Sequence, residues 1–381
     1  LEFRRVLFRS PVVLRNVLEN PGWYTAYTPY QPEISQGRLE SLILFQTMIE
    51  DLTGLPVANA SLLDEPTAAA EAMRLAQRSS KNDSNIFLVD KDTHPQTIAV
   101  INNRAKPIGI EVKLIDLVKE ELVDNAFGIL VSYPSSTGKI QNLFDFGKAC
   151  KEKGIVVIAA TDLLALTLIE EPTIFGAEIA IGSAQRFGVP LGFGGPHAGF
   201  MSVTEELSRS LPGRLVGVSV DSTGRAAYRL ALQTREQHIK REKATSNICT
   251  AQALLAVMAS MYAVYHGPDG LKRIAGNVHN LTSLLAAELE KIGYKIENKT
   301  WFDTITFSLP AQTNQTVIKE MAEKNRINFR YDVNNKLGIS FDETTSPEDV
   351  QAIVNMLAEA VNEPAKEIAD DTKIKSPLSG N

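Results

Sequence analysis

Apolar side chains recur every three to four residues near the start of the chain, which is the period of a helix with one buried face. Leu39 and Leu42 belong to such a stretch over Gln36–Asp51, and Gly54 then supplies a residue that commonly ends a helix. A second helix is expected over Glu65–Arg78, where alanine, the strongest helix former, is frequent. The first part of the chain is therefore predicted to be helical.

The pattern then changes to short, continuous apolar runs that alternate with helix-like stretches. Such runs are typical of strands buried on both faces, so the alternation predicts an α/β fold with a mainly parallel sheet. Strands are expected at Asn85–Asp90, Ile108–Lys113, Phe127–Tyr133, Gly154–Ala159, Glu178–Ile181, Ala198–Val203 and Val216–Val220. Helices are expected at His94–Asn102, Asp116–Val123, Phe144–Lys153 and Asp162–Ile169.

After about residue 250, two long helices, Ala251–Tyr265 and Leu271–Ile292, introduce a different rhythm. Ser346 followed by Pro347 is a good start signal for a last helix. Between them, strands are expected at Tyr294–Glu297, Phe302–Leu309, Ile327–Tyr331 and Leu337–Phe341, and a helix at Gln315–Lys324. This part of the chain is predicted to be a small α+β domain.

These patterns divide the chain into four parts. Residues 1–10 begin without Met and are interpreted as a non-native segment, and residues 11–265 as an N-terminal segment followed by a large domain. Residues 266–361 form the small domain, and the polar residues 362–381 are typical of a linker. A chain that ends in a linker is expected to have been cut before a continuation.

The composition of the chain argues against nucleic acid, membrane and metal as binding partners. The net charge of −6 over 381 residues argues against a nucleic-acid partner, because phosphate binding favours a basic surface. No apolar run approaches the roughly 18–20 residues that a membrane span needs. The five histidines have no metal-site spacing, and the two cysteines, Cys150 and Cys249, fit a reducing compartment without disulfides. We therefore expect neither a metal nor a membrane partner.

Three motifs carry both a functional and a structural interpretation. The segment Tyr24–Arg38 could direct tyrosine hydroxyls into a cleft or could be a rigid strap. The helix start at Asp64 and Glu65 is well capped by carboxylates, which would also repel a phosphate. The loop Gly192–Gly199 lacks the spacing of a nucleotide loop and is interpreted as a glycine turn.

A fourth motif is the hydroxyl-rich turn in Gln233–Thr250. Thr245, Ser246 and Asn247 could donate hydrogen bonds to a phosphate, or could cap the helix that follows. The two interpretations are compatible, because an exposed helix N-terminus is also an anion site.

Lysine is absent from the whole stretch between Lys153 and Lys240. That stretch contains Gly182–Phe187 and Gly192–His197, and it resembles the core of an enzyme that uses pyridoxal phosphate (PLP). Such an enzyme needs a lysine there, because the lysine amine forms the Schiff base that holds the cofactor. A scaffold without this lysine suggests half of an active site.

Taken together, the motifs resemble the N-terminal half, or separate first subunit, of the glycine cleavage system P-protein family, glycine dehydrogenase (decarboxylating). Pro66 stands where the family often has Gly, which stiffens the turn. The residues that carry the resemblance are Tyr27–Gln31, Glu33–Glu40, Ser61–Ala72, Phe193–His197, Leu230–His238 and Lys243–Thr250.

The resemblance implies the PLP-dependent transferase fold of type I (aminotransferase-like), with a large domain around a seven-stranded sheet and a small C-terminal domain. Two related halves pack as a pseudo-dimer, and PLP is bound to a lysine of the C-terminal half, or second subunit. In this chain the lysine position falls at Gln185 or Arg186. Neither side chain can form the Schiff base, in agreement with the lysine gap.

The implied reaction removes CO2 from glycine and passes the aminomethyl group to the lipoylated H-protein. By the same resemblance, Tyr27, Tyr30 and Gln31 are expected to line the substrate cleft. By analogy with dimers of this fold, the turn Thr245–Asn247, which includes Ser246, is expected to reach the partner's PLP phosphate across the interface. The compartment would be the cytoplasm in a bacterium and the mitochondrial matrix in a eukaryote.

Two alternatives remain open. The chain could be a pseudoenzyme scaffold or a regulatory binding protein that kept the fold and lost the chemistry. A complete aminotransferase that uses Lys240 or Lys243 is disfavoured, because both lie on a charged helix beyond the expected strand. The linker-like C-terminal tail favours a part of a larger enzyme over both.

Overall fold

The computed structural model describes residues 11–24, 31–119, 122, 125–232, 237–244, 248, 251–332, 335–364, 367, 368 and 378. Two compact units make up the chain. The large unit comprises Ser10–Tyr133 and Asn142–Pro268, and the small unit comprises Leu1–Arg9, Pro134–Gln141 and Asp269–Asn381. The large unit ends at Pro268, three residues beyond the end expected from the sequence. Residues 134–141 were not assigned to the small unit from the sequence.

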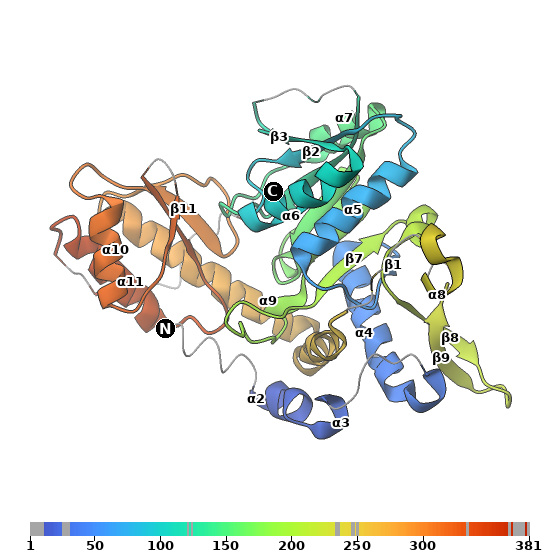
Figure 1. The fold of residues 1–381 in the computed structure, drawn as a ribbon. Helices are drawn as coiled ribbons and strands as arrows, with labels where there is room; N and C mark the ends of the chain where they lie inside the picture. The colour runs from blue at the N-terminus through green and yellow to red at the C-terminus, as the bar shows by residue number, and fades with distance from the viewer. Residues whose placement is uncertain are drawn as a thin grey trace. The chain divides into compact units, whose positions relative to one another are not determined.

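A seven-stranded sheet in the order β1-β7-β6-β5-β4-β2-β3 forms the centre of the large unit (Figure 1). Strands β3, β2, β4, β5 and β6 pair in parallel with their neighbours in this order, whereas β7 pairs antiparallel with both β6 and β1. Every residue of β2 and β4 is buried, which explains their continuous apolar sequence. The strands are β1 (Val57–Ala58), β2 (Ile86–Asp90), β3 (Glu111–Ile115), β4 (Ala126–Tyr133), β5 (Val156–Asp162), β6 (Ile179–Ser183) and β7 (Gly199–Val203).

The predicted fold class and the number of strands in the sheet are confirmed, but one of the seven strands was assigned wrongly. The stretch predicted as Val216–Val220 belongs to a separate hairpin of β8 (Leu215–Val220) and β9 (Ala226–Ala231). The short β1 takes its place at the edge of the sheet. Burial explains the error, because Val218 and Val220 are exposed although their sequence is as apolar as that of a core strand.

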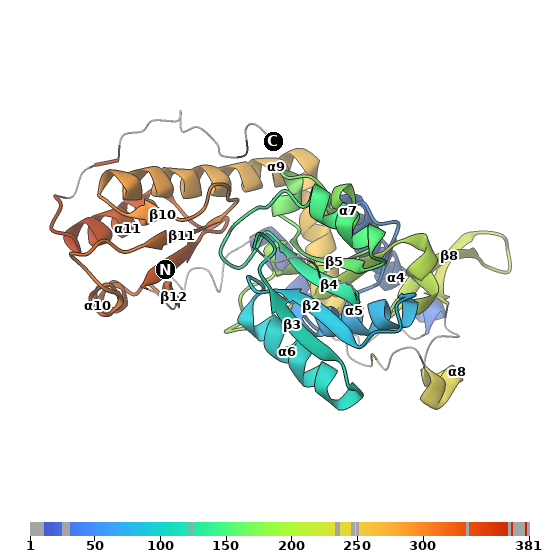
Figure 2. The same ribbon diagram turned by 90° about the horizontal axis from the view of Figure 1, so that it is seen from above.

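Helix α5 packs across β4, β5, β6 and β7, and α6 lies beside it (Figures 1 and 2). The alanines that predicted the helix are buried in its contact with the sheet. Close packing leaves little room there, since a Cβ at Gly128 of β4 would lie 3.1 Å from Ala76 Cβ. Small side chains on both elements therefore set this contact. The α-helices of this unit are α2 (Pro11–Val13), α3 (Pro21–Tyr24), α4 (Gln36–Thr53), α5 (Glu65–Ser79), α6 (Pro95–Ala105), α7 (Phe144–Glu152), α8 (Gln237–Lys240) and the first part of α9 (Ala253–Lys291).

Two predicted helices differ in the structure. A turn follows Asp116, and residues 120, 121, 123 and 124 of the predicted helix lie outside the described part of the chain. Only a short 3-10 turn, Ala165–Thr167, forms within the predicted helix Asp162–Ile169. Asp162 starts that turn by accepting hydrogen bonds from the backbone N–H groups of residues 164 and 165, at 2.8 and 3.1 Å.

The small unit contains a four-stranded antiparallel sheet in the order β10-β11-β13-β12. Its strands are β10 (Lys295–Ile296), β11 (Thr304–Ser308), β12 (Arg330–Asp332) and β13 (Lys336–Ser340), and its helices are α10 (Gln315–Lys324), α11 (Pro347–Glu359) and the last part of α9 (Ala253–Lys291). Gly267 interrupts α9 with φ 64° and ψ 175°, where the sequence predicts a break. At the start of α11, Ser346 and Asp349 form a capping box.

The segment 134–141 joins the small unit through hydrogen bonds and a very close backbone approach. Thr137 O accepts hydrogen bonds from Asn298 Nδ2 at 3.0 Å and from Thr306 Oγ1 at 2.9 Å. Gly138 has φ +85°, and a Cβ there would lie 1.9 Å from Thr304 O. Only glycine fits this position, which ties a loop from the end of β4 to β11.

Candidate functional site

Four parallel strands of the large unit end at the same edge of the sheet, and each ends in polar residues. Asp90 ends β2, Asp162 ends β5 and Ser183 ends β6, while Ser132 lies one residue before the end of β4. In α/β sheets, ligands bind at the carboxyl ends of the strands. This edge is therefore the candidate site of the large unit.

An ion pair links the ends of β5 and β6. Arg186, in the 3-10 turn Ala184–Arg186 that follows β6, places Nη1 3.4 Å from Asp162 Oδ2. Gln185 turns elsewhere, since its Nε2 donates to Val189 O at 2.8 Å. Of the two positions predicted to replace a lysine, the structure thus brings Arg186 to the acidic group and packs Gln185 against its own loop.

A carboxylate also lies at the N-terminus of α5. Asp64 caps the helix by accepting from Thr67 N at 2.9 Å, as the sequence predicts. Glu65, the next residue, accepts a hydrogen bond from Thr97 Oγ1 at 3.2 Å. Withdrawal from water raises the pKa of Glu65, and the electrostatic interaction with nearby His94 opposes that rise. The helix terminus that could attract an anion is therefore already next to a carboxylate of this chain.

Asp90 is the most enclosed acidic group at this edge, with 1% of its surface exposed. Its Oδ1 accepts from Asp92 N at 3.0 Å, whereas Oδ2 has no hydrogen-bond partner among the described residues. Burial is the largest cause that raises the pKa of Asp90, to about 6. Beside it, Ser132 Oγ donates to Thr93 Oγ1 at 3.0 Å. Asp90, Ser132 and Thr93 were not singled out as site residues from the sequence.

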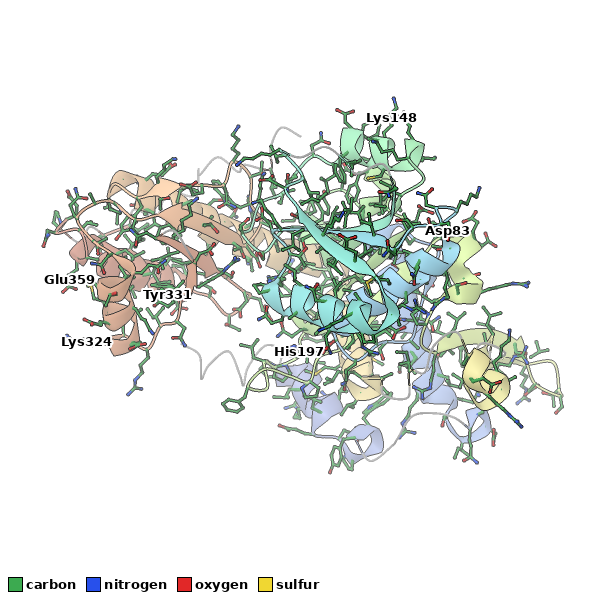
Figure 3. All side chains as sticks on the ribbon, turned by 45° about the horizontal axis from the view of Figure 1, so that its top comes forward. Asp83, Lys148, His197, Lys324, Tyr331 and Glu359 are labelled. Atoms are coloured by element: carbon green, nitrogen blue, oxygen red, sulfur yellow. The ribbon has the colours of Figure 1, made fainter. Side chains whose placement is uncertain are left out.

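The glycine loop after β6 has an unusual backbone. Gly192, Phe193, Gly194 and Gly195 have φ values of 55°, 57°, 111° and 130°, all in the region that favours glycine. Phe193 nevertheless occupies one of these positions, and 88% of its side chain surface is exposed. His197, labelled in Figure 3, lies within hydrogen-bond distance of the Leu191 carbonyl oxygen, 3.2 Å from Nε2. An exposed aromatic ring on a strained loop is a common feature of binding sites.

Most of the predicted cleft and phosphate residues cannot be placed. Tyr27, Tyr30, Thr245, Ser246 and Asn247 lie outside the described residues. Gln31 is described and exposed, directly before the 3-10 turn Pro32–Ile34. Their proposed roles therefore remain predictions. The sequence signal that could have revealed Phe193 was a large apolar residue enclosed by three glycines, outside any helix or strand period.

Other kinds of site receive no support from the described part of the chain. It holds no group of three or more His, Cys, Asp or Glu side chains that could bind a metal ion. No helix among the described residues combines the length and apolarity needed to cross a membrane. Cys150 is buried, and burial raises the pKa of its thiol to about 12, so it is unreactive at neutral pH.

Comparison with known sequences points to one family. Residues 7–357 match the family described as Glycine cleavage system P-protein. Proteins named glycine dehydrogenase (decarboxylating) from Rhodopseudomonas palustris (strain BisA53) and Gluconobacter oxydans (strain 621H) are 58% and 57% identical over 342 and 343 residues. These matches cover 90% of this chain but only 35% and 36% of the relatives. The chain thus spans about 35% of the length of the curated relatives it matches.

Solved structures agree with this result. A crystal structure of glycine decarboxylase (P-protein) of the glycine cleavage system, in inhibitor-bound form, is 34% identical, with a TM-score of 0.86 over 92% of this chain and 82% of that chain. An aspartate aminotransferase of subgroup IV from Thermus thermophilus, 17% identical, shares the fold with a TM-score of 0.59 over 88% of this chain and 93% of that one. The chain therefore belongs to the glycine cleavage system P-protein family and has the type I fold of PLP-dependent transferases.

Proposed function

We propose that this chain is the half of a glycine decarboxylase that lacks the cofactor lysine, and that it completes the active site of a lysine-bearing half. The observation that carries the proposal is the pair between Arg186 and Asp162 at the ends of β6 and β5. A guanidinium stays protonated and forms no Schiff base under physiological conditions. The chemistry that PLP supplies, an electron sink for the glycine carbanion, would belong to the other half.

The described residues at this edge do not fit PLP. At the N-terminus of α5, the Asp64 side chain already accepts the backbone N–H of Thr67 at 2.9 Å, so a phosphate dianion would have to displace it. The Arg186 side chain reaches the acidic group of β5 and offers no amine for covalent attachment. Both observations support placing the cofactor on the lysine-bearing half.

This chain would then contribute part of the interface between the halves, orient the bound glycine and cofactor, and exclude water from the cleft. Tyr27, Tyr30 and Gln31 are proposed to line the glycine cleft, and Thr245–Asn247 to donate hydrogen bonds to the cofactor phosphate on the partner half. The exposed ring of Phe193 supports an interface near the glycine loop, because aromatic anchors are typical of binding surfaces. In the complete enzyme, glycine would lose CO2 and its aminomethyl group would pass to the lipoyl arm of H-protein.

The test combines this chain with the lysine-bearing half, PLP, glycine and lipoylated H-protein, and measures CO2 release. We expect release from the mixture and none from this chain alone. A chain with Ser246→Ala and Asn247→Ala should still support association but should weaken PLP binding to the mixture by about tenfold, the effect of losing roughly 1.4 kcal/mol of hydrogen bonding.

Each alternative predicts another result. CO2 release by this chain without the other half would contradict the proposal. A mixture that associates yet releases no more CO2 than the lysine-bearing half alone would indicate the scaffold or regulatory protein instead. Unchanged PLP affinity in the double variant would remove the phosphate role from the turn while leaving the proposed half-enzyme intact.

A further inference from the structure

The hairpin of β8 and β9 carries a continuous apolar face, of which only one end is covered. The cross-strand pairs on this face are Val216 with Leu230, Val218 with Tyr228, and Val220 with Ala226. Val216 and Leu230 are buried, whereas Val218 and Val220 are each 68% exposed. Figure 1 shows the hairpin extending from the large unit beyond α4. The outer end therefore presents apolar side chains that nothing in the described chain covers.

Two glutamines of α4 hold the hairpin, one at the base of β8 and the other at the middle of β9. Gln46 donates to Val216 O at 3.1 Å and accepts from Val216 N at 2.8 Å, so its amide takes the place of a neighbouring strand. Gln36 does the same for β9, donating to Tyr228 O at 2.8 Å and accepting from Tyr228 N at 2.9 Å. The hairpin is thus held firmly at its base, and its outer end has a defined position in the large unit.

These bonds also define which backbone groups of β8 remain open. In an antiparallel pair, alternate residues direct their N–H and C=O groups away from the partner strand. Val216 does so and bonds to Gln46, and hence the backbone groups of Val218 and Val220 also point outward. Neither has a hydrogen-bond partner among the described residues. The outer half of β8 is an open edge strand with apolar side chains and no Lys or Pro to protect it.

We propose that this outer hairpin surface, defined by Val218, Val220 and the open edge of β8, is where the lysine-bearing half of the enzyme docks. The inference rests on the proposed function. Exposed apolar edge strands are aggregation sites unless another surface covers them. A strand of the partner that adds to β8 would bond its open backbone groups and bury its apolar side chains. The chain spans only 35% of a relative's length, so most of such a protein lies outside this structure and is available to cover the surface.

The position of the hairpin along the chain supports the same occupant. Strand β9 ends at Ala231, and Thr245–Asn247, the turn proposed to reach the partner's cofactor, begins fourteen residues later in the sequence. A hairpin docked on the lysine-bearing half would leave only a short stretch of chain between the interface and that turn. The surface would therefore both hold the two halves together and position the segment that completes the active site.

The experiment compares a chain with Val218→Asp and Val220→Asp with wild type and with Val118→Asp, a matched control. Val118 is 66% exposed and lies in a turn after β3, away from the hairpin in the sequence. Affinity for the purified lysine-bearing half is measured by sedimentation, and folding by circular dichroism. We expect the double variant to bind at least tenfold more weakly with an unchanged thermal unfolding curve, and the control to bind like wild type.

Two results would overturn the docking surface alone. Normal binding by the double variant, with CO2 release intact in the mixture, would remove the hairpin from the interface while leaving the proposed function standing. Self-association of the wild-type chain that the double variant abolishes, with normal binding to the lysine-bearing half, would assign the surface to a second copy of this chain. Failure of the wild-type chain to bind that half would overturn both the docking surface and the proposed function.

Discussion

Asp90 places a carboxylate at the end of a fully buried strand, where water scarcely reaches it. Burial raises its pKa from an ordinary 3.8 to about 6 in the folded chain. Because the folded pKa exceeds the unfolded one, the contribution of Asp90 to stability is greatest below the ordinary value and is lost as the pH rises through about 6. At neutral pH the fold therefore retains an unfavourable buried charge.

Replacing Asp90 with Asn should remove this pH dependence. Between about pH 5 and pH 8, we expect the free energy of unfolding of wild type to fall by about 1 to 2 kcal/mol more than that of Asp90→Asn. Urea unfolding of both proteins at several pH values provides the measurement. Parallel curves for the two proteins would show that Asp90 does not titrate in this range.

At the scale of elements, the loop that leaves β4 can approach β11 closely because Gly138 has no side chain. Gly138 combines a positive φ with a backbone approach to Thr304 that no side chain fits. Gly109 offers a matched comparison, because it has a similar φ of +72° but nothing within 4 Å of an added Cβ. The two positions separate the cost of backbone strain from the cost of a steric clash.

Gly138→Ala should destabilise the small unit by about 3 kcal/mol, the sum of left-handed strain and overpacking against Thr304. Gly109→Ala should cost only about 1 kcal/mol, because strain alone remains. Hydrogen exchange of the small-unit amides and thermal unfolding would report the difference. Equal costs at the two positions would show that the loop can move away from β11.

Sequence patterns anticipated the elements whose burial is uniform, such as β2, β4 and α5, because a continuous apolar run or an alanine-rich period has one simple interpretation. They missed β9, since Ala226–Ala231 has few β-branched or aromatic residues and its pairing with β8 defines it. They also missed the clamp by Gln46, whose partner is 170 residues away. A polar residue on the buried stripe of α4 was the only local signal.

At the scale of the whole molecule, the lysine gap predicted that no amine would stand at the cofactor position. The acidic partner of Arg186 could be identified only once the order of the strands was known. Asp162 and Arg186 are far apart in sequence and meet because β5 and β6 are parallel neighbours that end at one edge. The likeness to the P-protein family covers most of this chain but about a third of its relatives' length. We therefore propose that the covalent chemistry belongs to a part of the enzyme outside this chain.

The most direct test of that assignment is borohydride trapping of PLP on the purified 381-residue chain, followed by peptide mapping by mass spectrometry. A Schiff base at an active-site lysine would be reduced to a stable amine on one residue in every chain. We expect only sparse labelling, spread over exposed lysines, with or without glycine. Labelling of one lysine in every chain, above all Lys240 or Lys243, would contradict it.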